Sequence, residues 1–293
     1  MTRKFLIGSA LVLLVLAGIV FWFIRGDTAS LTVDEVSGAD PVLEEDFDAQ
    51  TIPTVAIARP IGWAAGEAPG AADGLNVTRF AEGLDHPRTM LTLPNGDVVV
   101  ALARAPANSL PEGLTGRIMG WLMGRAGAAG PSPDKLVLLR DGDGDGKAEQ
   151  RFILREGLSS PSGMAFRDGR LIVANHDAIL SFAFEPGATK LEGEPEKLAD
   201  LPAAGLHWMR NIVLSPDGKQ LYAAVGAASN IAENGMEAER GRATIWEFSL
   251  NGGKIARRPY ATGLRNPNGL AWNPATGELW TTVNERDGLG EDT

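Results

Sequence analysis

One pattern occurs four times along this chain, and this internal repeat constrains the fold more than any other feature. It consists of a Gly-Leu pair, an apolar strand, a turn that contains glycine, and a second strand rich in β-branched or aromatic residues. The copies begin at Gly83, Gly157, Gly205 and Gly263. Because a repeated unit of this size is stable only when copies stack, the repeat determines the architecture before any single segment does.

The third copy, GLHWMRNIVLSPDGKQLYAAVG, is the clearest. Its two strands, residues 211–214 and 220–225, flank the turn SPDG. Proline presets φ at the first corner of such a turn, and glycine tolerates the positive φ that follows. We therefore expect a tight β-hairpin at this point in every copy.

Two further strands follow each hairpin. We predict them at residues 135–141 and 149–157, at 178–184 and 191–198, and at 243–250 and 254–260. Four strands per unit, with a period of about 40 to 50 residues, are typical of a β-propeller blade. No segment of the repeat region shows a long apolar stripe of helical period, so the predicted fold class is all-β, a β-propeller.

The chain contains too few blades to close a propeller. The fourth copy has room for only two strands before Thr293, which predicts about three and a half blades. Propellers close with about 4 to 8 complete blades, and an open ring leaves bare strand edges. We therefore expect the chain to be truncated at its C-terminus. Residues 75–81 read as a lone strand of the kind that completes the last blade of a closed ring.

An apolar run precedes the repeats. Residues 5–24 are uncharged and long enough to span a bilayer as a helix. Arg3 and Lys4 precede the run, so the positive-inside rule places the N-terminus in the cytoplasm and the rest of the chain outside. The alternative is a cleaved signal peptide, but its apolar region is about 7 to 15 residues long. Trp22 and Phe23 also stand where its cleavage site needs small residues.

These features predict three parts. Residues 1–26 form a transmembrane anchor, residues 27–74 a flexible linker, and residues 75–293 a partial β-propeller domain. The expected location is the inner membrane, with the propeller facing the periplasm. An insertion at residues 113–133 carries enough apolar residues to form a short helix that covers or packs on the propeller.

Composition excludes two classes of function. The formal net charge of -10 argues against a nucleic-acid partner, because phosphate neutralisation needs a basic face. The chain has no cysteine, which excludes disulfides and thiolate metal sites.

A run of alternating carboxylates indicates a cation site. Asp141, Asp143 and Asp145 are separated by glycines, the spacing of the first half of an EF-hand loop. The closing glutamate of an EF-hand would fall at Phe152, and Glu149 is the nearest carboxylate. Two interpretations remain open here: a structural calcium between two strands, or a solvated turn without metal.

His207 is the candidate catalytic residue among three histidines. His86 and His176 are expected in loops or at the rim. His207 stands at the start of the innermost strand of its unit, which borders the central channel of a propeller. A neutral histidine there can act as a general base near pH 7. A purely structural role is the alternative.

Arg265 and Asn266 occupy the same place in the next unit. A guanidinium and an amide that project toward one channel form a plausible pair for binding an anion. Alternatively, the arginine at the start of this strand is bonded to loop carbonyls.

Four stretches together resemble the glucose/sorbosone dehydrogenase family, in particular its membrane-anchored L-sorbosone dehydrogenase-like branch. They are GLDHPRTMLTLPNGDVVVA, GRIMGWLMGRAGAAGPSPDKLVLLRDGDGDGKAE, GLHWMRNIVLSPDGKQLYAAVGAASN and GLRNPNGLAWNPATGELW. The resemblance covers about residues 76–293. It implies a six-bladed propeller that binds pyrroloquinoline quinone (PQQ) over the central channel together with calcium, and that oxidises sugars or their aldehydes.

The resemblance also assigns roles to residues. His207 matches the family's general base, and Arg265 and Asn266 match the pair beside the quinone. The loop that contains Asp287 and Gly288 resembles the one whose backbone carbonyls help to hold the calcium at the quinone. The implied partner is a small sugar or aldehyde, and the electron acceptor is not indicated.

Two rival functions remain. One is a calcium-dependent lactonase on a similar propeller, and the other is a propeller that only binds. Ala227 stands where soluble glucose dehydrogenases have an aspartate, which is a departure from the family pattern.

Overall fold

The computed structural model describes most of the chain. The described residues are 2–24, 30–42, 57–285 apart from 65, 108, 111, 204 and 251–254, and residue 287. The chain divides into two compact units. One unit comprises Met1–Ala58 with Arg286–Thr293, and the other comprises Arg59–Glu285.

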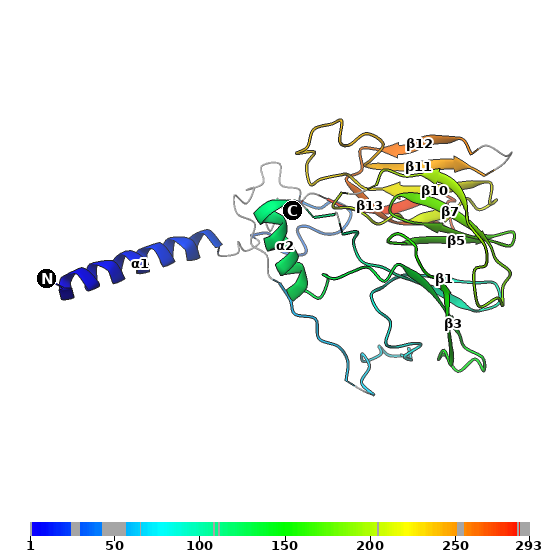
Figure 1. Cartoon of the computed structure of the whole chain (residues 1–293), viewed down its shortest axis with the longest axis horizontal. Helices are drawn as coiled ribbons and strands as arrows, with labels where there is room; N and C mark the ends of the chain where they lie inside the picture. Colours follow the sequence, from blue (N-terminus) through cyan, green and yellow to red (C-terminus); the bar gives the residue numbers. More distant parts are fainter. Residues whose placement is uncertain are drawn as a thin grey trace. The chain divides into compact units, whose positions relative to one another are not determined.

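The first unit contains helix α1 (Thr2–Ile24), which covers the apolar run near the N-terminus (Figure 1). The helical conformation expected for residues 5–24 is therefore confirmed. Over the described residues, however, no helix is both long enough and apolar enough to cross a membrane. The transmembrane anchor predicted for residues 1–26 stays a prediction.

The described residues of the second unit form four antiparallel sheets, and the first three of these sheets have four strands each. In chain order these strands are β1 (Pro87–Thr92), β2 (Val98–Leu102), β3 (Lys135–Arg140) and β4 (Gln150–Arg155), then β5 (Gly163–Arg167), β6 (Arg170–Ala174), β7 (Ala178–Ala183) and β8 (Glu196–Asp200), then β9 (Ile212–Leu214), β10 (Gln220–Val225), β11 (Thr244–Ser249) and β12 (Arg257–Thr262), and finally the pair β13 (Asn266–Trp272) and β14 (Leu279–Asn284). The predicted all-β class and the three and a half propeller-like blades are confirmed.

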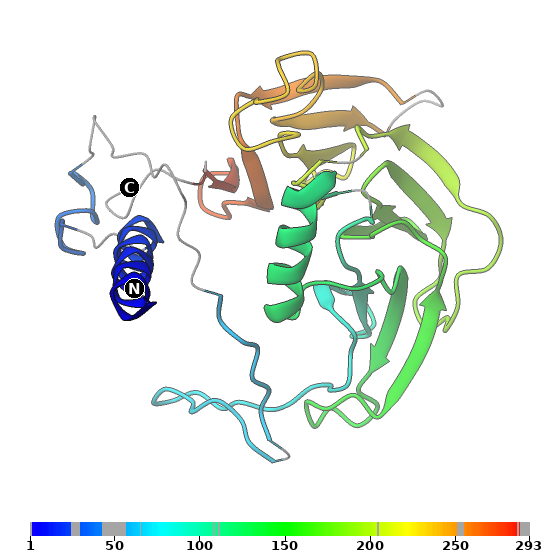
Figure 2. The same cartoon turned by 60° about the vertical axis from the view of Figure 1, so that its left-hand side comes forward.

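The sheets follow one another around an arc (Figure 2). The first strands of successive sheets contact each other, β1 with β5, β5 with β9, and β9 with β13. These strands are therefore the inner strands of the arc. The predicted insertion helix is confirmed as α2 (Gly113–Arg125).

Apolar side chains between neighbouring sheets form the core. Leu138 and Phe182 belong to the cluster between the first two sheets. Ile172 and Leu221 belong to the cluster between the second and third. Because successive side chains of a strand point to opposite faces, a middle strand such as β2 buries both of its faces.

Two expectations about strands were wrong. Residues 75–81 form no strand, because Phe80 and Ala81 pack on the outer face of the first sheet instead. The Phe80 carbonyl accepts a bond from Ala148 N at 2.8 Å rather than joining a ladder. Strands β8 and β12 also begin later than predicted, since these outer strands are largely exposed and lack a clear apolar alternation.

The inner strands lie unusually close at one point. A Cβ on Gly163 would lie 2.2 Å from the carbonyl oxygen of Arg210, so only glycine permits this approach. Side-chain bonds accompany the contact: Arg210 N donates to Ser162 Oγ at 2.7 Å, and Thr89 Oγ1 donates to Ser162 O at 2.7 Å. The next junction is bridged by the amide of Asn211, which donates to Asn268 Oδ1 at 3.2 Å.

An ion pair between the buried carboxylate of Asp97 and the partly exposed Arg140 lies at the far end of the first sheet. Arg140 Nε and Nη2 donate to the two carboxylate oxygens of Asp97, each at 2.7 Å. Asp97 is 2% exposed, and the bond from Arg140 is the largest cause that lowers its pKa. Asp97→Asn is expected to reduce the free energy of unfolding by about 2 kcal/mol near neutral pH, because the two hydrogen bonds from Arg140 lose their charged acceptor.

The stability that the ion pair between Asp97 and Arg140 contributes should decrease in acid. A carboxyl group with a depressed folded pKa contributes stability above its unfolded pKa, about 3.9, and loses it as the pH falls through the folded value. The difference between Asp97→Asn and the wild type should therefore shrink in acid, measured by urea unfolding. As a control, Asp200→Asn breaks only an exposed pair with Lys197 and should cost less than about 1 kcal/mol. Equal losses in both variants would contradict the prediction.

Candidate active site at the ends of the inner strands

The loop before β9 positions His207. The imidazole is half-buried, and its Nδ1 lies 2.8 Å from the carbonyl oxygen of Ala227, just after β10. A carbonyl oxygen can only accept, so Nδ1 carries the proton of the neutral ring and Nε2 is its basic nitrogen. The bond therefore fixes both the tautomer and the orientation of the ring.

A glycine brings the side chains of two blades together. A Cβ on Gly226 would lie 2.5 Å from Asn266 Oδ1 and 2.6 Å from His207 Cβ. Because position 226 has no side chain, the imidazole from the third blade and the amide from the fourth can both approach it. The structure thus places two of the predicted site residues beside one backbone position.

Arg265 is bonded as in the alternative interpretation. Its Nε donates to Asn230 O at 3.0 Å, and Nη2 donates to Asn230 Oδ1 at 2.6 Å. Nη1 donates to the carbonyl of Asn284 at 3.0 Å and to that of Glu285. The guanidinium therefore fastens the loop after β10 to the end of β14, and the cofactor-binding role of Arg265 stays a prediction.

Sequence reasoning missed a contact between the first and third blades. The guanidinium of Arg88, in β1, lies 5.1 Å from the ring centre of Trp208, whose side chain is buried. Burial, and then the charge of Arg104, lower the pKa of Arg88. Two neighbouring cations favour the approach of an anion. The repeat aligns Arg88 with Arg210, and it gives no signal for the contact between Arg88 and Trp208.

Glu239 was also missed. Its carboxylate accepts from Ala228 N at 2.7 Å and from Ser229 Oγ at 3.1 Å. These bonds hold the chain that leaves β10, and with it the carbonyl that orients His207. Nothing in the local sequence distinguishes this glutamate from the exposed acids around it.

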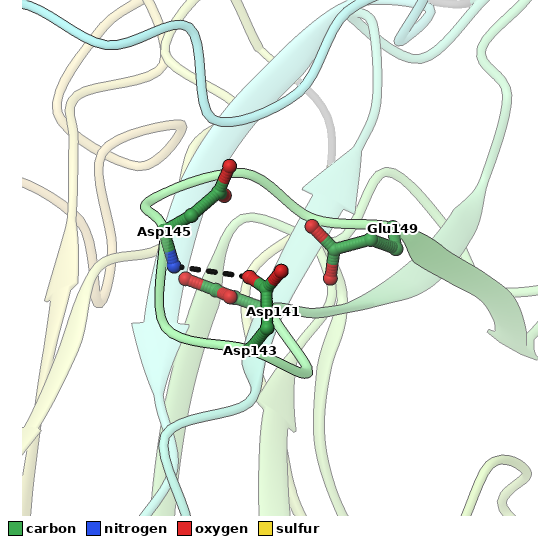
Figure 3. Close-up of side chains that lie close together, drawn as sticks. All are labelled: Asp141, Asp143, Asp145 and Glu149. Atoms are coloured by element: carbon green, nitrogen blue, oxygen red, sulfur yellow. Dashed lines mark hydrogen bonds between the residues drawn. The ribbon is translucent and has the colours of Figure 1, made fainter.

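The predicted cation loop gathers four carboxylates. Ligand oxygens of Asp141, Asp143, Asp145 and Glu149 all lie within 4.8 Å of one another (Figure 3). Glu149 thus closes the loop in place of the EF-hand glutamate. The acids are mostly exposed, and oxygen ligands in this number suit calcium.

Backbone amides shape this loop around Asp141. Its carboxylate accepts from Gly146 N at 2.9 Å and from Gly144 N at 2.6 Å. These bonds, with that from Gly146 the largest, lower the pKa of Asp141. The carboxylate therefore stays ionised even in weak acid.

The loop is remote from His207 along the sheet. It joins β3 to β4, and the register pairs Leu139 with Val98, at the end where β2 begins. The inner strand starts at the other end, where Pro87 pairs with Leu102. The Asp loop and the channel-side residues are therefore two separate sites. The quinone-side calcium loop stays a prediction, because Gly288 lies outside the described residues and Asp287 is in the other unit.

Calcium is expected to stabilise the protein through the Asp loop. Without a cation the clustered carboxylates repel one another, so calcium should raise the melting temperature by about 2 to 4 °C. Asp143→Ala should abolish this rise, measured by differential scanning fluorimetry. Asp168→Ala, at an exposed turn outside the cluster, is the control and should keep it. If calcium raised the melting temperature of Asp143→Ala as much as that of the wild type, the predicted calcium site would be refuted.

The fold and the site define a class. Successive four-stranded sheets around an arc, with a histidine, an amide and an arginine–tryptophan contact at the ends of the inner strands, describe a propeller-type protein with a polar site on its axis side. The chain belongs to the TrAA12-like family, whose model matches residues 136–293, more than half of the chain. The resemblance to the glucose/sorbosone dehydrogenase family is confirmed at this level. No curated protein matches the chain.

Solved structures share the fold. The PQQ domain of pyranose dehydrogenase from Coprinopsis cinerea matches with a TM-score of 0.58 at 18% identity, over 74% of this chain and 48% of that one. The calcium structure of the carbohydrate-active enzyme of family AA12 from Trichoderma reesei gives a TM-score of 0.57 at 18% identity, over 76% and 53%. The chain thus spans about half the length of these proteins.

Proposed function

We propose that the chain contributes the base-bearing half of a PQQ-dependent dehydrogenase that oxidises a sugar or a sugar aldehyde. One observation carries the proposal: His207 is held by Ala227 in the tautomer that has a basic Nε2, beside the amide of Asn266. Membership of the TrAA12-like family and the fold shared with the PQQ domain of a pyranose dehydrogenase support it.

The residues present suit PQQ, a planar group with several carboxylates. Arg88, whose guanidinium lies over the buried ring of Trp208, supplies a positive charge that suits an anion. In the described structure, Arg104 Nε is a buried donor without a hydrogen-bond partner. The quinone would supply the acceptor for the hydride of the substrate. Calcium would be held by the loop predicted around Asp287, while the Asp141–Asp145 loop would be structural.

The roles of the chain's own groups follow from their positions. Nε2 of His207 would take the proton of the sugar hydroxyl, while Nδ1–H remains bonded to the Ala227 carbonyl. Asn266 would orient the bound group through its amide. Arg265 would act indirectly, because its bonds to Asn230 hold the loop after β10 in place.

The lactonase alternative has less support. That chemistry needs acidic and amide side chains on one metal in the channel. Among the described residues, the acids that could hold a metal gather in the β3–β4 loop, at the other end of the sheet from His207. A propeller that only binds its ligand remains an outcome of the test below.

The test uses the purified full chain with PQQ and calcium. PQQ should bind, measured by equilibrium dialysis, and sugars or sugar aldehydes should then reduce a dye only when both additions are present. Lactone hydrolysis without dye reduction would favour the hydrolase. Binding without either reaction would favour a binding propeller, and a folded chain that fails to bind PQQ would overturn the proposal.

We further propose that the domain works outside the cytoplasm, on the basis of the basic residues that precede the apolar run. Fractionation of the producing cells tests this proposal. Recovery of the full chain from the cytoplasm alone would contradict it.

A further inference from the structure

A buried arginine lies directly behind the candidate base. Arg210 has no exposed surface, and its guanidinium donates to three carbonyls of the loop that carries His207. Nη1 lies 2.7 Å from His207 O and 2.9 Å from Met209 O, and Nη2 lies 2.8 Å from Pro202 O. One cation therefore ties both ends of this loop together.

The charge of Arg210 has no packing explanation. Each of these acceptors is a neutral carbonyl, and removing a cation from water is costly. Burial, followed by the charge of Arg242, lowers the pKa of Arg210 to about 9. The guanidinium nevertheless stays charged near neutral pH. Its three hydrogen bonds hold the loop, and they place a positive charge next to the main chain of the residue that carries the imidazole.

The geometry points to Arg210 as the positioning residue of His207. It fixes the main chain of the base, and its positive charge disfavours a proton on the adjacent imidazole, which keeps the base neutral and ready to accept one. The inference rests on the proposed function only where it names His207 as the base. The effect on the imidazole itself exists with or without a cofactor.

Other charged groups lie around the same loop. Arg242 lies beside Gly205, and Arg265 lies at the start of the next blade. On the acidic side, Asp177 acts on the buried arginine, and Glu239 is occupied by its bonds to the chain after β10. Arg210 differs from all of these, because it bonds to the backbone oxygen of the histidine itself.

The first measurement uses the wild-type full chain without cofactor or sugar. The chain has three histidines, so an NMR titration shows three imidazole signals, and the signal lost in His207→Gln is assigned to His207. We expect His207 to titrate clearly below the ordinary pKa of about 6.5. A value at or above that of an unperturbed histidine overturns the inference, and this result needs no variant of Arg210.

Two substitutions separate charge from packing. Arg210→Met should raise the pKa of His207 by about 1 unit, whereas Arg210→Lys, which keeps the charge, should leave it close to the wild-type value. The matched control is Arg258→Met, which removes an exposed arginine from the outer strand of the same blade. This substitution should leave the pKa of His207 unchanged. A folded Arg210→Met chain with an unchanged His207 titration overturns the inference.

Activity provides an independent comparison. In the PQQ-loaded enzyme, the acid limb of the pH profile of kcat/KM should move up by the same amount in Arg210→Met. If NMR shows the expected pKa values of His207 but the PQQ-loaded chain oxidises no sugar, the proposed function fails and the inference about Arg210 stands. If sugar is oxidised while His207 titrates normally, only the inference about Arg210 fails.

Discussion

His207→Gln is expected to lower the turnover of sugar oxidation by about 10² to 10⁴, the usual contribution of a general base. Glutamine keeps the size and polarity of the side chain and can still donate to the Ala227 carbonyl, but it has no basic nitrogen. The affinity for PQQ should change little, because Arg88, Trp208 and Asn266 remain. Steady-state dye reduction and equilibrium dialysis measure the two quantities separately.

The control for this variant is His86→Gln, at the corresponding loop of the first blade, which should turn over like the wild type. Two results would contradict the assignment of His207. Wild-type turnover in His207→Gln would move the base elsewhere, and complete loss of PQQ binding would make the histidine a cofactor ligand instead.

Gly226→Ala should be nearly as damaging to activity, although it adds only one methyl group. That methyl would lie 2.6 Å from His207 Cβ and 2.5 Å from Asn266 Oδ1, so the imidazole or the backbone of β10 must move. A displacement of about 1 Å in a reacting group can cost about 10² in rate. We expect a loss of that order in kcat, with the circular dichroism spectrum retained.

A matched glycine separates this effect from a general loss of stability. Gly70→Ala makes the same substitution where a Cβ would meet nothing within 4 Å, and it should leave kcat unchanged. Wild-type kcat in Gly226→Ala would show that the close approach at this position is not needed for the reaction.

The repeats made the fold predictable because their information is local. The hairpin turns, such as SPDG between β9 and β10, specify their geometry within a few residues, and the structure has each hairpin where it was expected. Residues 75–81 were assigned wrongly because the formation of a strand depends on contacts that are not local. A strand exists only where a partner lies beside it, and the sequence of one segment does not contain that partner.

The site was less predictable than the fold. His207 was identified from its place in the repeat, but the contact of Trp208 with Arg88 joins residues that belong to the third and first blades. No periodic pattern encodes such a pair. Arg265 illustrates a further limit, since a guanidinium suits a bound anion and a set of loop carbonyls equally well, and only the fold around Asn230 and Asn284 decides between them.

The dispersed origin of the site residues has a consequence for synthesis on the ribosome. Arg88 is made with the first repeat, His207 and Trp208 with the third, and Asn266 only with the fourth. Domains begin to fold from the N-terminus while translation proceeds at about 5 to 20 residues per second. A nascent chain can therefore stack its early sheets, yet the side chains of His207 and Asn266 meet at Gly226 only after the fourth repeat has left the exit tunnel. Under the proposed function, PQQ can therefore bind only after the fourth repeat has been synthesised.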